Sequence, residues 1–120
     1  MDCNLSDLKI LYVEDESVTR MAVTRVLQKR VSEVITAKNG KEGFELFQEH
    51  CPDIVLTDLQ MPVMDGWELV LAIRKINKEV PIIVISAYDY DNSNSLVSDS
   101  IVKPVLKDVL FDKIKFHTKN

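Results

Sequence analysis

Several residue patterns that mark common protein classes are scarce or missing in this chain of 120 residues. Only 3 glycines occur, and no glycine-rich run follows an apolar segment, which disfavours P-loop and dinucleotide-binding folds. The 2 cysteines, Cys3 and Cys51, lack metal-ligand spacing and are expected to be reduced structural thiols. No apolar run approaches the roughly 18 residues of a membrane span, and the N-terminus lacks the apolar core of a secretory signal. We therefore expect a cytoplasmic protein that does not contact a membrane.

Excess positive charge is also missing, since the formal net charge is −4 and acidic and basic residues are interspersed. A chain of this charge is not attracted to nucleic acid or anionic lipid, so its partners are expected to be proteins. The length allows one ordinary domain with one sizeable core, because 46% of the residues are hydrophobic. We therefore predict a single domain over residues 1–120.

What the chain does contain is a regular alternation of short β-branched runs and amphipathic segments. The β-branched runs predict five strands, at 9–13, 33–37, 53–57, 81–86 and 100–102. The segments between them carry apolar stripes at helical spacing, and about five helices are expected. The fourth helix, within residues 88–99, is expected to be short or irregular because this stretch is rich in Asp, Asn and Ser. Strands that are apolar on both faces and alternate with helices predict an α/β, doubly wound fold with a parallel sheet.

Polar side chains follow most of these strands at the point where the apolar run ends. They are Glu14 and Asp15 after the first strand, Asp58 after the third, Ser86 at the end of the fourth and Lys103 after the fifth. Ligands of open parallel sheets bind at the carboxyl ends of the strands. If the first and third strands are neighbours, three carboxylates converge there, and their mutual repulsion requires a cation. Oxygen ligands favour Mg²⁺ over zinc, and no His or Cys lies near them in the sequence.

Asp58 is the candidate nucleophile because it lies at the end of its strand, where its side chain is expected to point into the crevice. A carboxylate beside a divalent ion can attack phosphorus and form an aspartyl phosphate, while the metal and Lys103 neutralise the transferring group. Glu14 and Asp15 are the acidic pair that would hold the ion, and Ser86 could donate a hydrogen bond to a phosphoryl oxygen. The alternative roles for these side chains are helix capping and simple solvation.

Four motifs taken together resemble the bacterial response-regulator receiver domain, from about Lys9 to Phe116. They are the acidic pair in VEDE (13–16), the phosphoacceptor segment DLQMPVMDGWEL (58–69), the pair Ser86-Ala87 and the segment IVKP (101–104). Each motif alone is a weak signal, but all four in this order are specific. The resemblance implies a flavodoxin-like five-stranded sheet of order 2-1-3-4-5.

The resemblance also implies the roles of the site residues and the partners. Mg²⁺ (or Mn²⁺) would be bound by Glu14, Asp15, Asp58 and the backbone carbonyl of Gln60, and the phosphoryl group by Ser86, Ala87 and Lys103. Gln60 and Tyr88 would modulate the loss of the phosphoryl group. The donor would be a sensor histidine kinase or a histidine phosphotransfer protein, and phosphorylation would switch binding to a downstream protein target. Such a domain is a signalling phosphoacceptor rather than an enzyme, because it catalyses only its own phosphorylation and dephosphorylation.

Some features depart from the family pattern. The stretch between Ser86 and Lys103 is shorter than usual by roughly one helical turn, and Ser100 occupies the position where the family usually has an aromatic switch residue. The surface that reports phosphorylation is therefore expected to be unusual. His50 and His117 have no phosphodonor-like neighbours in the sequence, and each is expected to be a solvated, isolated histidine.

Two other functions compete with this interpretation. The altered fourth helix suggests a receiver-like docking module that is never phosphorylated, although every residue that the chemistry needs is present. An aspartate-nucleophile phosphohydrolase would carry a second aspartate two residues after the nucleophile, where this chain has Gln60. No further domain follows the last predicted helix in this sequence, so the output is expected to pass through another chain, whether the protein is a single-domain relay or part of a longer one.

Overall fold

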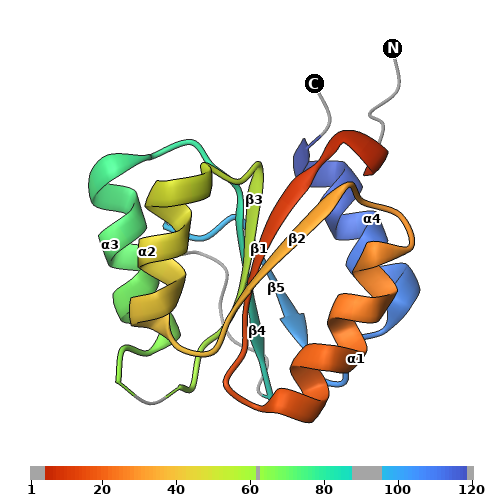
Figure 1. Cartoon of the computed structure of the whole chain (residues 1–120), viewed down its shortest axis with the longest axis horizontal. Helices are drawn as coiled ribbons and strands as arrows, with labels where there is room; N and C mark the ends of the chain where they lie inside the picture. Colours follow the sequence, from red (N-terminus) through yellow and green to blue (C-terminus); the bar gives the residue numbers. More distant parts are fainter. Residues whose placement is uncertain (1–4, 62, 88–95, 119–120) are drawn as a thin grey trace.

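The computed structural model describes residues 5–61, 63–87 and 96–118, which form one parallel sheet between two layers of helices (Figure 1). The strand order is β2-β1-β3-β4-β5, and every neighbouring pair is parallel. The strands are β1 Lys9–Val13, β2 Glu33–Ala37, β3 Ile54–Asp58, β4 Ile82–Ser86 and β5 Asp99–Val102. The helices are a short 3-10 helix at Leu5–Asp7, then α1 Ser17–Gln28, α2 Gly40–His50, α3 Gly66–Ile76 and α4 Lys107–Thr118. The predicted flavodoxin-like sheet of order 2-1-3-4-5 is confirmed.

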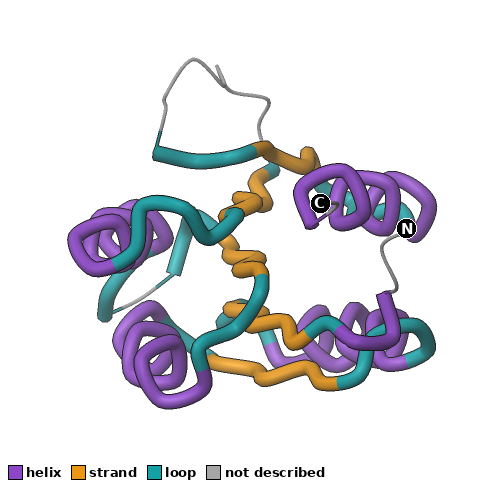
Figure 2. The backbone as a smooth tube through the Cα atoms, turned by 90° about the horizontal axis from the view of Figure 1, so that it is seen from above, coloured by secondary structure: helices purple, strands orange, loops and turns teal. Residues whose placement is uncertain are grey.

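Two apolar cores fill the spaces between the sheet and the helices. Helices α1 and α4 cover one face, and α2 and α3 cover the other, as the view from above in Figure 2 shows. Side chains of β1 alternate between the cores, with Ile10 and Tyr12 in the first and Leu11 and Val13 in the second. Strands β3 and β4 are buried along their whole length, which explains why their sequences are continuous apolar runs. Every helix within the described residues is too short or too polar to span a bilayer.

The start of α3 holds the loop that follows β3. Asp65 caps this helix by accepting a hydrogen bond from the Glu68 N–H at 2.9 Å, and the Glu68 side chain accepts one from the Asp65 N–H at 3.3 Å. At Gly66, the first residue of the helix, a Cβ would lie only 2.2 Å from the backbone oxygen of Asp58. Only glycine allows this close approach, so the capped helix start fixes the loop against the end of β3.

The predicted fourth helix falls largely outside the described residues, which do not include 88–95. Residues 96–98 are described and are not helical. The Arg74 side chain of α3 donates a hydrogen bond from Nε to the Leu96 carbonyl at 2.7 Å. The segment that leads into β5 is therefore held against α3 at Leu96. The described residues contain four α-helices, and the last predicted helix corresponds to α4.

The expectation of an isolated, solvated histidine at position 117 was wrong. His117 Nε2 lies 2.9 Å from Asp99 Oδ2, and Lys113 Nζ lies 2.8 Å from Asp99 Oδ1. Burial alone would raise the pKa of Asp99, but the hydrogen bonds from Lys113 and His117 outweigh burial and lower that pKa. No local sequence pattern predicts this contact, because its partners lie on different elements, β5 and α4. The three side chains tie the last helix to the edge strand.

Val63 adopts a backbone conformation that is unfavourable for a β-branched residue. Its φ is 71°, in the left-handed region, and its side chain is 76% exposed. We expect Val63→Gly to raise the free energy of unfolding by about 0.5–1 kcal/mol, since relief of the steric conflict exceeds the extra chain entropy of glycine. Urea unfolding would measure the change. The control Val18→Gly, at a similarly exposed position in α1, should instead lower stability by about 0.5 kcal/mol. A loss of stability in both variants would show that Val63 is not strained.

Candidate functional site

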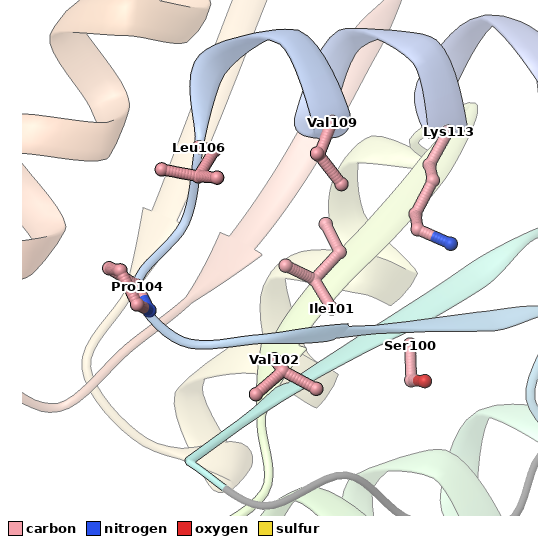
Figure 3. Close-up of a pocket in the computed structure, with 7 residues that line it drawn as sticks. All are labelled: Ser100, Ile101, Val102, Pro104, Leu106, Val109 and Lys113. Atoms are coloured by element: carbon pink, nitrogen blue, oxygen red, sulfur yellow. The ribbon is translucent and has the colours of Figure 1, made fainter.

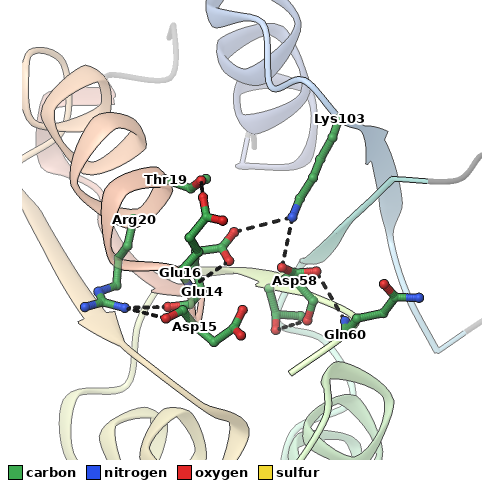
Figure 4. A network of polar contacts seen from close by, with 9 residues as sticks. Glu14, Asp15, Glu16, Thr19, Arg20, Asp58, Gln60 and Lys103 are labelled. Atoms are coloured by element: carbon green, nitrogen blue, oxygen red, sulfur yellow. Dashed lines mark hydrogen bonds and ion pairs between the residues drawn. The ribbon is translucent and has the colours of Figure 1, made fainter. Parts of the chain in front are cut away.

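Four strand ends bring the predicted site residues to one edge of the sheet. Glu14 directly follows β1, Asp58 ends β3, Ser86 ends β4 and Lys103 directly follows β5. Because all these strands are parallel, their carboxyl ends meet at the same edge. Figure 4 shows Glu14, Asp58 and Lys103 converging from three different strands.

The acidic side chains form one cluster. Glu14, Asp15 and Asp58 each place a carboxylate oxygen within 4.8 Å of the others. Glu14 and Asp58 are buried, while Asp15 is exposed to solvent. The cluster joins the end of β1 to the end of β3, the pair of neighbouring strands at which the chain order of the sheet reverses. The convergence expected from the sequence is therefore present.

Lys103 supplies the positive charge that faces this cluster. Its Nζ lies 3.0 Å from Asp58 Oδ2 and 3.7 Å from Glu14 Oε1. Burial alone would lower the pKa of Lys103, but its hydrogen bond and ion pair with Asp58 outweigh burial and raise that pKa. Lys103 therefore stays protonated and offsets one of the negative charges.

Lys103 alone does not neutralise the three carboxylates of the cluster. Burial, followed by the nearby negative charge of Asp58, raises the pKa of Glu14 to about 7. Glu14 Oε2 accepts a hydrogen bond from the Glu16 N–H at 3.2 Å, but the buried Oε1 has no hydrogen-bond partner among the described residues. A buried carboxylate oxygen that has only the 3.7 Å ion pair with Lys103, and that lies beside two other carboxylates, fits a divalent cation with oxygen ligands. These residues therefore fit Mg²⁺, and they fit zinc poorly because no His or Cys side chain joins the cluster in the described part of the chain.

The loop after β3 orients Asp58. The Gln60 N–H donates a hydrogen bond to Asp58 Oδ1 at 3.2 Å, while Lys103 holds the other carboxylate oxygen. The Gln60 side chain is exposed. Both oxygens of Asp58 are thus held in place, one by a backbone N–H and the other by a lysine side chain.

Arg20 belongs to the site, although the sequence patterns do not identify it. Its Nη1 donates hydrogen bonds to the backbone carbonyls of Glu14 at 2.8 Å and Asp15 at 3.4 Å (Figure 4). Arg20 lies in the first turn of α1, one turn beyond the acidic pair, and its side chain reaches back to the loop. The sequence spacing does not reveal this role, because Arg20 bonds to backbone carbonyls rather than to the carboxylates of the acidic pair.

The remaining predicted residues lie around this centre. Ser86 is buried, and its carbonyl accepts a hydrogen bond from the Lys103 N–H at 2.8 Å, so the two residues are adjacent. Ala87 is exposed at the rim, and Tyr88 lies outside the described residues. Ser100 lines a pocket of about 300 Å³ between β5 and α4, together with Val102 and Val109 (Figure 3). That pocket is separate from the acidic cluster.

Comparison with known proteins gives a consistent result. A sequence profile described as the response regulator receiver domain matches residues 10–115. The chemotaxis protein CheY of Bacillus subtilis is 35% identical over 112 residues, which cover 88% of this chain and 93% of CheY. The transcriptional regulatory protein PrrA of Mycobacterium tuberculosis is 32% identical over 120 residues, which cover 96% of this chain and 52% of PrrA. The chain therefore spans about half the length of PrrA and most of the length of CheY.

Solved structures agree with the sequence comparison. Response regulator protein TrrA from Thermotoga maritima, in complex with Mg²⁺-BeF, has a TM-score of 0.84 at 33% identity, covering 92% of this chain and 98% of that chain. Chemotaxis response regulator CheY4 of Vibrio cholerae has a TM-score of 0.84 at 28% identity, with the same coverage. The fold is thus shared with these proteins.

Proposed function

The chain belongs to the response regulator receiver domain family, and from that premise we propose that Asp58 accepts a phosphoryl group in a two-component phosphorelay. The observation that carries the proposal is the position of Asp58 at the end of β3. Its carboxylate there lies within 4.8 Å of the carboxylates of Glu14 and Asp15 and 3.0 Å from Lys103 Nζ. A nucleophilic carboxylate, an acidic pair and a fixed cation are the parts that transfer to an aspartate requires.

The bond changes in the proposed reaction are simple. One carboxylate oxygen of Asp58 forms a bond to phosphorus, while the bond from phosphorus to the donor's leaving atom breaks and its electrons remain with that atom. For a phosphohistidine donor the leaving atom is an imidazole nitrogen. Later, water attacks phosphorus, the bond from phosphorus to the Asp58 oxygen breaks with its electrons left on that oxygen, and inorganic phosphate leaves as the carboxylate is restored. The chain thus catalyses only its own phosphorylation and dephosphorylation, as a signalling phosphoacceptor does.

Two side chains are placed to stabilise the transferred group. Lys103 now pairs with an oxygen of Asp58, and it can neutralise phosphoryl oxygens once that oxygen has reacted. Ser86 lies at the end of the neighbouring strand, next to Lys103, and its hydroxyl can donate to a phosphoryl oxygen. Ala87 follows at the rim and would contribute its backbone N–H.

Metal binding is assigned to four groups. They are the carboxylates of Glu14, Asp15 and Asp58 and the backbone carbonyl of Gln60. When bound there, Mg²⁺ (or Mn²⁺) supplies positive charge that stabilises the phosphoryl oxygens. Glu14 Oε1, which has no hydrogen-bond partner among the described residues, supports this proposal.

The proposed partners are a sensor histidine kinase or a histidine phosphotransfer protein as donor, and a downstream protein that distinguishes the phosphorylated state. Incubation of the chain with acetyl phosphate, with Mg²⁺ or with EDTA, followed by intact mass measurement, tests the proposal. We expect a gain of one phosphoryl group that requires Mg²⁺. If neither acetyl phosphate nor a phosphorylated histidine phosphotransfer protein transfers a group, the alternative of a non-phosphorylated docking module would replace this proposal.

The lifetime of the aspartyl phosphate should depend on Tyr88. This bulky residue follows Ser86 and Ala87, and it is proposed to shield the acyl phosphate from water, with Gln60 as the second modulator. We expect Tyr88→Ala to shorten the half-life of the phosphorylated chain several-fold, which the decay of the phosphorylated mass after removal of acetyl phosphate measures. Tyr88→Phe keeps the ring and should keep the lifetime. An unchanged half-life in Tyr88→Ala would remove Tyr88 from the account.

A further inference from the structure

Tyr12 carries a fully buried phenol hydroxyl. The residue lies in β1, its exposed fraction is 0%, and it is the largest of the fully buried side chains. Its Oη has no hydrogen-bond partner among the described residues. Burying a hydroxyl in this way is costly, and phenylalanine would fill the same space without that cost. The hydroxyl therefore needs an explanation.

The position of Tyr12 in the sheet places it beneath the acidic cluster. Alternate residues of a strand share a face, so Tyr12 points to the same side of the sheet as Glu14. The register pairs Tyr12 with Leu56, two residues before Asp58, so Asp58 also extends from this side. The apolar core around Tyr12 contains Leu56 and residues of α1 and α4. The phenol of Tyr12 thus lies in this apolar core, on the side of the sheet from which Glu14 and Asp58 extend.

The Tyr12 hydroxyl and Glu14 Oε1 are complementary as hydrogen-bond donor and acceptor. A tyrosine phenol is protonated near neutral pH, because its ordinary pKa is about 10. The phenol therefore keeps its proton and remains a hydrogen-bond donor. Glu14 Oε1 is a buried acceptor that also lacks a hydrogen-bond partner among the described residues. A donor and an acceptor, both buried and two residues apart on one face, can satisfy each other directly or through one water molecule.

We propose that Tyr12 is a positioning residue for the metal site, whose hydroxyl donates a hydrogen bond to Glu14 Oε1 and fixes the carboxylate for Mg²⁺. This inference rests on the proposed function of the acidic cluster. Groups that hydrogen-bond to a metal ligand fix its orientation, and their removal typically weakens metal binding by about 10- to 100-fold. Because Tyr12 acts only through Glu14, we expect loss of its hydroxyl to weaken Mg²⁺ binding by a factor at the lower end of that range.

The test compares two hydroxyl deletions that leave side-chain volume nearly unchanged. Thr24 of α1 also has a buried Oγ1 without a hydrogen-bond partner among the described residues, and it provides the matched control. Mg²⁺ affinity is measured by NMR titration of the backbone amides, and stability by urea unfolding in EDTA. We expect Tyr12→Phe to weaken Mg²⁺ binding about tenfold without loss of stability, and Thr24→Val to leave Mg²⁺ binding unchanged.

The outcomes separate this inference from the proposed function. Equal Mg²⁺ affinity in Tyr12→Phe and the unaltered chain would overturn the role of Tyr12 while the metal site stands. Absence of Mg²⁺ binding by the unaltered chain would overturn the metal site and this inference together. If Tyr12→Phe fails to fold, the ¹³Cζ resonance of Tyr12 in the unaltered chain decides the question. A shift of that resonance with the same midpoint as the Glu14 amide supports the inference, and a resonance unaffected by Mg²⁺ overturns it.

Discussion

Asp58→Asn is expected to abolish phosphoryl uptake from acetyl phosphate. An amide oxygen is a far weaker nucleophile than a carboxylate, and the substitution also removes one of the three negative charges of the cluster. The variant should keep the fold, because asparagine has the same size and can still accept the hydrogen bond from Lys103. Intact mass after incubation with acetyl phosphate and Mg²⁺ measures the loss.

The matched control for this substitution is Asp112→Asn. Asp112 is exposed on α4, away from the strand ends, and its replacement should leave uptake unchanged. Uptake at the normal rate in Asp58→Asn would show that another residue accepts the phosphoryl group.

Glu14→Gln is expected to change metal binding and stability in opposite directions. The amide lacks the negative charge of the carboxylate, so Mg²⁺ affinity should fall on the order of a hundredfold, since ligand charge tunes such sites over orders of magnitude. In the metal-free chain, burial raises the pKa of Glu14 from 4.5 to about 7. A group whose pKa is higher in the folded chain than in the unfolded chain contributes fully to stability at pH values below its unfolded pKa. That contribution is lost as the pH rises through the folded pKa of about 7.

At pH 8 the metal-free chain therefore keeps a buried carboxylate ionised at a cost. We expect Glu14→Gln to be more stable than the unaltered chain at pH 8 by on the order of 2 kcal/mol, and nearly equal to it at pH 5. Urea unfolding in EDTA at the two pH values measures this. Glu16→Gln, at an exposed position two residues further along the chain, should change neither Mg²⁺ affinity nor the pH dependence of stability. The same pH dependence in Glu14→Gln and the unaltered chain would show that Glu14 is not the group that titrates.

The sheet and the strand-end residues could be predicted from the sequence for a physical reason. Strands buried on both faces must be apolar along their length, so each polar residue at the end of a run marks where the chain leaves the sheet. The parallel arrangement then brings these ends to one edge. Asp58 and Lys103, 45 positions apart in the chain, therefore meet in an ion pair of 3.0 Å.

Other features depend on packing between elements that no local pattern encodes. In the sequence Tyr12 is one residue of an apolar strand, and only the folded core shows that its hydroxyl lacks a hydrogen-bond partner in the part of the chain that the structure describes. His117 meets Asp99 because α4 lies against the edge strand, a contact set by the helix orientation rather than by spacing. The left-handed backbone of Val63 is likewise imposed by its loop, against the preference of a β-branched residue.

The central claim is that the phosphoryl group resides on Asp58, and reduction with borohydride tests it most directly. Borohydride converts an aspartyl phosphate to homoserine, and mass mapping of peptides then locates the modified position. We predict homoserine at position 58 after treatment with acetyl phosphate and Mg²⁺, and unmodified aspartate there after treatment with EDTA. Homoserine at another aspartate, or a phosphorylated chain with no homoserine at position 58, would contradict the account.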